Sequence, residues 1–172
     1  LQEYHYACGM PALINRCGML AGPWQMGKVD QGVVTLWVAR HLFGQALNYI
    51  GYGGTGKQVR DLLHIDDLAS LVLSQCRSAE GWKGQVYNVG GGNKVSTSLL
   101  ELTSICREVT GKNIEIGATA ETSNMDVRIF ITDSRKVRDA YRWGPERSVR
   151  DIVSDIHAWI VADRERLSTI LG

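Results

Sequence analysis

The glycine-rich stretch from Gly51 to Gly56 constrains the fold of this chain most, because it fits two phosphate-binding patterns without the context that either needs. Gly51, Gly53 and Gly56 satisfy the dinucleotide pattern G-x-G-x-x-G. Gly51 and Gly56-Lys57 also satisfy all but the last position of the phosphate-loop pattern G-x-x-x-x-G-K-[ST]. That last position is Gln58, which lacks the hydroxyl that a phosphate loop places on magnesium. Both patterns require a helix that begins directly after the glycines.

The residues after the glycines predict a strand where a phosphate loop needs a helix. Val59 to Ile65 is a short run, and Asp66-Asp67 behind it suits the first turn of a helix that begins about ten residues too late for a phosphate loop. We therefore interpret the glycines as a hairpin turn that joins a strand at Leu47 to Ile50 to a second strand at Val59 to Ile65.

Strand and helix candidates alternate along the rest of the chain, which predicts an α/β fold. Ser98 with Glu101, and Ser148 with Asp151, form capping-box patterns at the starts of two helices. In the second of these helices an apolar stripe follows the 3.6-residue period and is predicted to face the core: Val149, Ile152, Val153, Ile156, Trp159 and Ile160. Strands are predicted at 12–17, 85–89, 114–116 and 128–132, and helices at 1–8, from Asp30 or Gln31 to 44, at 66–77, 98–110 and 134–141, and from 148.

The charge pattern excludes several classes of partner. The 19 basic and 18 acidic residues are mixed along the 172 positions and give a net charge of +1, so no basic block indicates nucleic acid. No apolar run is long enough to span a membrane. The four cysteines show no C-x-x-C spacing and predict buried free thiols in a reducing compartment, hence a cytoplasmic protein. The four histidines show no ligand spacing, so we expect no metal site.

Several motifs together resemble the C-terminal half of the extended short-chain dehydrogenase/reductase family, the NAD-dependent nucleotide-sugar epimerases and dehydratases. The resemblance covers essentially the whole chain in the right order, and within the family it is strongest to the CDP-paratose (CDP-tyvelose) 2-epimerase group. The matching segments are Asn15-Arg16 to Gly22-Pro23, Gly54 to Asp61, His64 to Leu68, Val86 to Gly92, Asp126 with Asp133 to Lys136, and Trp143-Gly144-Pro145.

The resemblance implies a C-terminal part of a Rossmann-like parallel sheet together with a small mixed α/β substrate-binding lobe. Residues 1–172 would then form one partial domain. Its last Rossmann elements would lie at 11–29 and 66–111, and the substrate-binding lobe at 30–65 and 112–172. A sheet without its first strands exposes an edge and an apolar face, so we expect a possible homodimer.

The family uses NAD, but its glycine fingerprint and its catalytic Tyr-x-x-x-Lys pair are not found in these residues, where no tyrosine has a lysine four positions on. We therefore expect no catalytic residue here. The resemblance places Cys17 and Gly18 where the chain passes the nicotinamide, although a small residue there can simply allow close approach. Met19 stands where the family has a substrate-binding asparagine, and Ser123 where it often has an arginine.

The remaining candidates are substrate-binding residues, each with a plain structural alternative. The resemblance places Arg60 against a diphosphate, whereas as a strand residue it would pair with Asp61 or Asp66. The helix start at Asp30 and Gln31 could offer amides to the same diphosphate, or Asp30 could be only an N-cap.

Aromatic and charged residues farther along complete the set. Tyr49 and Tyr52 could stack on a base or pack within the hairpin. Asp126 and Arg128 could reach ribose hydroxyls or phosphate, or form a surface salt bridge. His64, Asp66 and Ser70 could be written as a hydrolase triad, but no G-x-S-x-G elbow accompanies them.

The leading hypothesis is the substrate-binding half of an NAD-dependent epimerase acting on a CDP- or UDP-linked hexose. A nucleotide-sugar dehydratase or reductase is the alternative enzyme. A stand-alone nucleotide-sugar binding module, or a remnant without activity, is the alternative of a different class.

Overall fold

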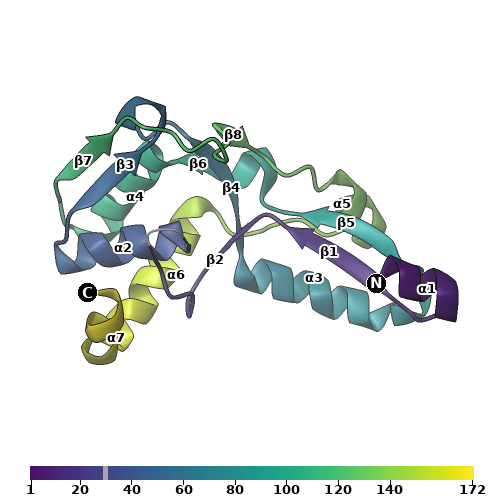
Figure 1. Ribbon diagram of the computed structural model, residues 1–172. Helices are drawn as coiled ribbons and strands as arrows, with labels where there is room; N and C mark the ends of the chain where they lie inside the picture. The colour runs from purple at the N-terminus through teal and green to yellow at the C-terminus, as the bar shows by residue number, and fades with distance from the viewer. Residues whose placement is uncertain (29–30) are drawn as a thin grey trace.

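The computed structural model describes residues 1–28 and 31–172, and its elements separate into two groups with short strands between them (Figure 1). One group contains α1 (Gln2–Cys8), β1 (Leu13–Cys17), α3 (Ile65–Arg77), β5 (Gln85–Val89) and α5 (Arg135–Tyr141). The other contains α2 (Val33–Phe43), β3 (Leu47–Ile50), α4 (Leu99–Thr110), β7 (Ile116–Thr119), α6 (Val149–Ala162) and α7 (Arg164–Leu171). Between them run β2 (Met19–Ala21), β4 (Val59–His64), β6 (Ser96–Ser98) and β8 (Ile129–Phe130).

The pair β1 and β5 confirms the two parallel strands that the sequence predicted. Their register runs from Leu13 opposite Gln85 to Cys17 opposite Val89. Both strands therefore end at the same edge, where the amide of Gly18 donates to the carbonyl of Val89 at 2.8 Å. A small core forms here from Leu63, Leu71, Tyr87, Val89, Val137 and Trp143.

The larger core lies among α2, α4 and α6. The stripe on α6 that the 3.6-residue period predicted is buried throughout, with Ile152, Val153, Ile156 and Ile160 at 0% exposure. Both predicted capping boxes are present, at Ser98 with Glu101 and at Ser148 with Asp151. The lobe boundaries proposed above stay a prediction; in the structure, α4 packs into this larger core with α2 and α6.

The predicted hairpin at the glycines is wrong. β3 pairs in parallel with β7, whereas β4 pairs with β2, β6 and β8, so β3 and β4 are not neighbours. The glycines form a turn that packs against other parts of the chain. A Cβ on Gly54 would lie 2.6 Å from that of Ala118 in β7, and one on Gly56 would lie 2.8 Å from the ring of Tyr49. Local alternation identifies strands, but these long-range contacts select their partners.

Several element limits differ from the prediction. α3 begins at Ile65, where the side chain of His64 accepts the cap hydrogen bond from the amide of Asp66. α2 begins at Val33, so Gln31 precedes the helix, and Asp30 lies outside the described residues. The strands expected at 114–116 and 128–132 are observed as β7 and the short β8.

The cysteines are free, but the expectation that all four are buried is wrong, because only Cys106 is buried and Cys8, Cys17 and Cys76 are exposed. Among the described residues, no helix is long and apolar enough to cross a membrane.

Candidate functional site

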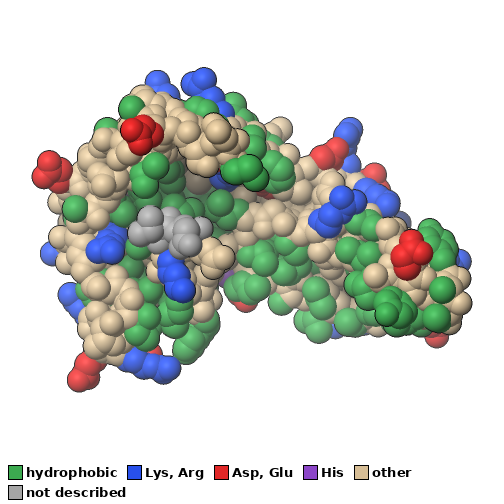
Figure 2. All heavy atoms as spheres, in the orientation of Figure 1, with side chains coloured by type: hydrophobic (Ala, Val, Ile, Leu, Met, Phe, Trp, Pro, Cys, Tyr) green, Lys and Arg blue, Asp and Glu red, His purple; other side chains and the backbone are tan. Residues whose placement is uncertain are grey.

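Two cavities meet beside Met19 and form one groove over the middle strands, next to α2 and α4. The first, of about 540 Å³, includes Cys17, Gly18 and Gln31 in its lining. The second, of about 260 Å³, is lined by Arg60 and Asp126 among others. Met19, Val33 and Val34 belong to both linings. In Figure 2 this region is a hollow above α2 and in front of β4 and β6, with hydrophobic side chains inside it. The groove therefore brings together six of the residues that the resemblance selected.

Arg60 forms an ion pair with Asp126 at the wall of the smaller cavity. Its Nη2 donates to Oδ1 of Asp126 at 2.6 Å, and its Nη1 donates to the carbonyl of Val59 at 2.8 Å. The two side chains keep 24% and 32% of their surface exposed, so the pair remains accessible from the groove. The partners expected for a purely structural Arg60, Asp61 and Asp66, are not its partners.

The alternation of side chains along β4 explains why Asp61 does not pair with Arg60. Asp61 is 1% exposed and accepts hydrogen bonds from the amide and hydroxyl of Thr132, both at 3.1 Å, and from the amide of Gly92 at 3.0 Å. The sequence reasoning missed this buried carboxylate. The available signal was its place on a strand between a groove residue, Arg60, and the buried Leu62.

Tyr49 and Tyr52 make structural contacts around the ion pair of Arg60 and Asp126. The hydroxyl of Tyr49 donates to Thr103 at 2.8 Å, and its ring stacks on Trp37 with centroids 6.2 Å apart. The hydroxyl of Tyr52 donates to the carbonyl of Asp126 at 2.8 Å and so holds the loop that presents the Asp126 carboxylate. Tyr52 thus lies near the groove through Asp126, whereas Tyr49 is turned toward the larger core.

Arg128 differs from Arg60 in its surroundings. It is exposed, it does not line the groove, and its carbonyl accepts the amide of Val59 at 2.9 Å. Its backbone therefore aligns β4 with the segment leading into β8.

The groove end at Cys17 and Gly18 lies at the carboxyl end of β1, where open α/β sheets bind ligands. Partial burial raises the pKa of the Cys17 thiol. Gly18 has a packing reason to be glycine, since a Cβ there would lie 2.7 Å from the hydroxyl oxygen of Thr132. Gln31 is exposed at the same cavity, and Asp30 lies outside the described residues.

The hydrolase arrangement is not formed. Nδ1 of His64 accepts the amide of Asp66 at 3.0 Å, its Nε2 lies 3.3 Å from Oδ2 of Asp155, and the hydroxyl of Ser70 donates to the carbonyl of Asp67. Within residues 1–28 and 31–172, no group of histidine, cysteine and acidic residues is arranged to hold a metal ion.

Comparison with known proteins identifies the family. Residues 1–90 match the model of the NAD dependent epimerase/dehydratase family. The CDP-paratose 2-epimerase of Salmonella typhi is 30% identical over 162 residues, which cover 91% of this chain and 47% of that protein. This chain belongs to the NAD-dependent epimerase/dehydratase family.

Other members of the family agree in sequence and in fold. A dTDP-glucose 4,6-dehydratase of Xanthomonas campestris is 24% identical over 99% of this chain and 48% of its own length. The UDP-glucose 4-epimerase of Thermotoga maritima, solved with UDP-glucose, superposes with a TM-score of 0.80 at 25% identity, covering 96% of this chain and 50% of that one. The chain thus spans about half the length of these relatives. The Rossmann-like α/β architecture that the sequence predicted is confirmed.

Proposed function

We propose that the chain is the substrate-binding half of an NAD-dependent nucleotide-sugar epimerase that acts on a CDP- or UDP-linked hexose. One observation carries the proposal: the accessible ion pair of Arg60 and Asp126 lines the same groove that extends past Met19 to Cys17 and Gly18. The first 90 residues match an NAD-dependent family, and a CDP-sugar 2-epimerase is 30% identical over most of the chain, which supports the nucleotide-sugar class.

Arg60 is suited to hold the diphosphate. A guanidinium binds two oxygens of one anion at once, and an exposed pair can exchange one anionic partner for another at modest cost. The diphosphate would replace the Asp126 carboxylate on Arg60, and that carboxylate would then be free to accept from a ribose hydroxyl. Met19 and Val33 would contact the sugar ring with apolar atoms, because both line the two cavities where they meet.

In this chain, NAD would contact only the end of the groove that contains Cys17 and Gly18. Cys17 and Gly18 stand at the carboxyl end of a parallel strand, where the nicotinamide edge would lie. The glycines at 51–56 are followed by β4, so they offer no helix N-terminus to a pyrophosphate. Bound NAD supplies a hydride acceptor and donor. The residues of this chain would bind the nucleotide sugar and orient its ring toward that edge.

The alternative enzyme, a nucleotide-sugar dehydratase, is supported by the dTDP-glucose 4,6-dehydratases among the relatives. Calorimetric titration of the chain with CDP, UDP, GDP and dTDP tests the proposal and separates the two enzymes. We expect CDP or UDP to bind at least about tenfold more tightly than the others, a difference of ~1.4 kcal/mol. A preference for dTDP would favour the dehydratase, and no binding of any of the four would contradict the substrate-binding role.

Activity provides a second test. We expect the 172-residue chain with added NAD to leave nucleotide sugars unchanged, since it contains no Tyr-x-x-x-Lys pair. Turnover by the purified chain would contradict its assignment as the substrate-binding half.

A further inference from the structure

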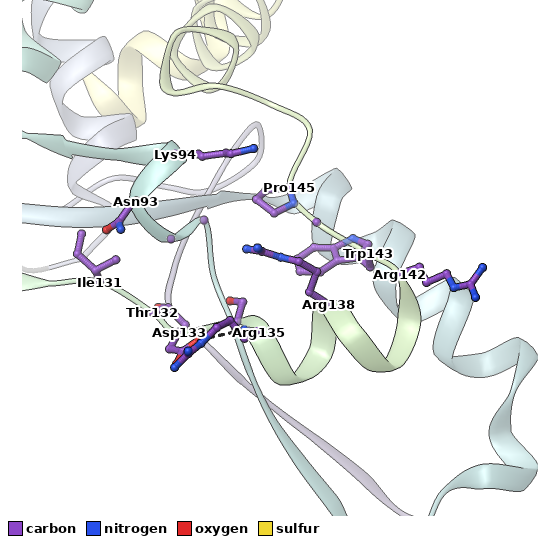
Figure 3. Close-up of a pocket in the computed structure, with 14 residues that line it drawn as sticks. Asn93, Lys94, Ile131, Thr132, Asp133, Arg135, Arg138, Arg142, Trp143 and Pro145 are labelled. Atoms are coloured by element: carbon purple, nitrogen blue, oxygen red, sulfur yellow. Dashed lines mark hydrogen bonds and ion pairs between the residues drawn. The ribbon is translucent and has the colours of Figure 1, made fainter.

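A separate cavity of about 830 Å³ lies at the carboxyl end of β5, between the glycine loop that follows this strand and α5 (Figure 3). Its walls come from the loop Gly91 to Lys94, from the segment Ile131 to Arg135, and from Arg138 and Arg142 to Pro145. None of these residues lines the groove beside Met19. The cavity is therefore lined by a different set of residues from the proposed substrate site, although both lie near the carboxyl ends of β1 and β5.

The charged residues that line this cavity are mostly positive, although the whole chain has a net charge of only +1. The lining holds Lys94, Arg135, Arg138 and Arg142 against a single carboxylate, Asp133. That carboxylate is bound by Arg135, whose Nη2 donates to Oδ2 at 2.6 Å. Hydrogen bonds from Arg135 lower the pKa of Asp133 to about 2, so the two charges offset each other at neutral pH.

Two cationic side chains, Lys94 and Arg138, are left to bind an anionic ligand. In Figure 3 the guanidinium of Arg138 extends from α5 toward the glycine loop, while Arg142 extends away from the cavity. Lys94 lies on the facing wall, in the turn after the glycines. In the part of the chain that the structure describes, neither Lys94 nor Arg138 has an ion-pair partner. Both are thus available to an anion from solution.

The wall that carries Lys94 is held rigidly. The amide of Gly90 donates to the hydroxyl of Ser134 at 2.9 Å, and the amide of Gly92 donates to the buried carboxylate of Asp61. The backbone at Gly91 is packed closely against β4, since a Cβ there would lie 2.0 Å from the carbonyl oxygen of Leu62. The carboxylate of Asp61 lies behind this wall, and its three hydrogen bonds join the wall to β4. A preformed wall lowers the entropic cost of binding.

The remaining wall is apolar and includes Trp143 and Pro145. Trp143 is 8% exposed and is fixed by its indole N–H, which donates to the carbonyl of Asp67 and to the hydroxyl of Ser70, both at 3.1 Å. Pro145 adjoins it. An aromatic and a proline side chain together form a surface that suits a planar or sugar ring.

We propose that this cavity binds a small organic phosphate, a molecule of the size of a nucleoside monophosphate. Lys94 and Arg138 bind its phosphate, and Trp143 and Pro145 contact its ring. The site is a second one, additional to the nucleotide-sugar groove.

Calorimetry with CMP and with inorganic phosphate tests this in the Arg60→Ala chain, where the groove has lost its proposed anion-binding residue. We expect CMP to bind at millimolar concentrations or below. We expect Lys94→Ala with Arg138→Ala, added to this background, to weaken CMP binding by about tenfold or more. The matched control is Arg77→Ala with Lys112→Ala, which removes the same charge from exposed positions outside the cavity and should change the affinity by less than about threefold.

Each other outcome overturns a stated part of the proposal. If CMP fails to bind the Arg60→Ala chain, or binds the cavity variant as tightly as its parent, the site is not there. If the control variant loses as much affinity as the cavity variant, overall charge explains the binding. If inorganic phosphate binds as tightly as CMP, the wall of Trp143 and Pro145 has no part in recognition. Thermal unfolding of each variant shows whether it is folded, so that lost binding is not mistaken for lost structure.

Discussion

The guanidinium of Arg60 and the carboxylate of Asp126 come from segments 66 positions apart, yet they lie 2.6 Å from each other at the wall of one groove. Tyr52 fixes this geometry, because its hydroxyl binds the carbonyl of Asp126. An anion that enters the groove meets an arginine that already has a partner. Binding there therefore exchanges one anion for another on Arg60. The effect of substituting Arg60 or Asp126 on ligand affinity follows from this exchange.

Arg60→Ala should weaken CDP or UDP binding by about tenfold to a hundredfold, the loss expected when a charge-assisted fork to a diphosphate is removed. Arg128→Ala should change the affinity by less than about threefold, because Arg128 is exposed and does not line the groove. Arg60→Lys, which keeps the charge without the fork, should lie between them. Calorimetry measures all three, and equal affinities for the Arg60→Ala and Arg128→Ala chains would show that the assignment of Arg60 is wrong.

Asp126→Asn should strengthen the binding of inorganic pyrophosphate by a few fold, because the amide no longer competes with the ligand for Arg60. The same change should not strengthen CDP binding to that extent, since the carboxylate is also proposed to accept from the ribose. The comparison of the two ligands in one calorimetric series separates these effects. A weaker affinity for pyrophosphate would contradict the exchange of anions.

Asp61→Asn should destabilise the fold by about 2 to 4 kcal/mol. The carboxylate accepts from the amide and hydroxyl of Thr132 and from the amide of Gly92, and an asparagine would turn an N–H group toward at least one of these donors. Urea unfolding measures the loss. The exposed Asp139→Asn is the control and should stay within about 0.5 kcal/mol of the unchanged chain.

Ser98→Ala should cost about 1 kcal/mol at pH 7, because the hydroxyl caps α4 in a box with Glu101. Hydrogen bonds from the backbone and side chain of Ser98 lower the pKa of Glu101. A carboxyl whose pKa is depressed on folding contributes stability above its unfolded pKa, and this contribution is lost as the pH falls through its folded pKa. The effect of Ser98→Ala should therefore shrink below about pH 4. Unfolding curves across this range check the trend, and an effect that grows with acid would contradict it.

The thiols should react at different rates with a thiol-specific reagent at pH 8. Cys8 and Cys76 are exposed and should react first. Cys17 is exposed as well, but it should react more slowly, because partial desolvation raises the pKa of its thiol. Cys106 should react only on unfolding, since burial raises its pKa to about 12. Mass spectrometry of the labelled peptides gives the order, and rapid labelling of Cys106 would show that α4 opens readily.

The sequence predicted those features that depend on neighbouring residues. The capping boxes at Ser98 and Ser148 follow from local hydrogen bonds, and the buried stripe on α6 follows from the period of the helix. The hairpin failed because the partner of β3 is β7, which lies far away in the chain. No local pattern encodes that pairing.

The residues of the candidate site also differ in whether a sequence motif or only the folded structure identifies their role. The family motif selected Arg60 and Asp126, and the structure brings them together. Asp61 was noticed only as a possible partner of Arg60. Its actual role depends on Thr132 and on the loop at Gly92, which only the folded chain brings beside it. The cavity at Arg138 was missed for the same reason, because its two cations come from separate segments.

The adjacency of Arg60 and Asp61 on β4 has an evolutionary consequence. One of these residues faces the nucleotide-sugar groove, while the other braces the wall of the second cavity. A single-residue insertion or deletion that shifted β4 in its sheet would exchange the two side chains and disable both places at once. Length changes in this part of the chain should therefore accumulate in the exposed turn before β4, for example around Lys57, and be absent from the strand itself.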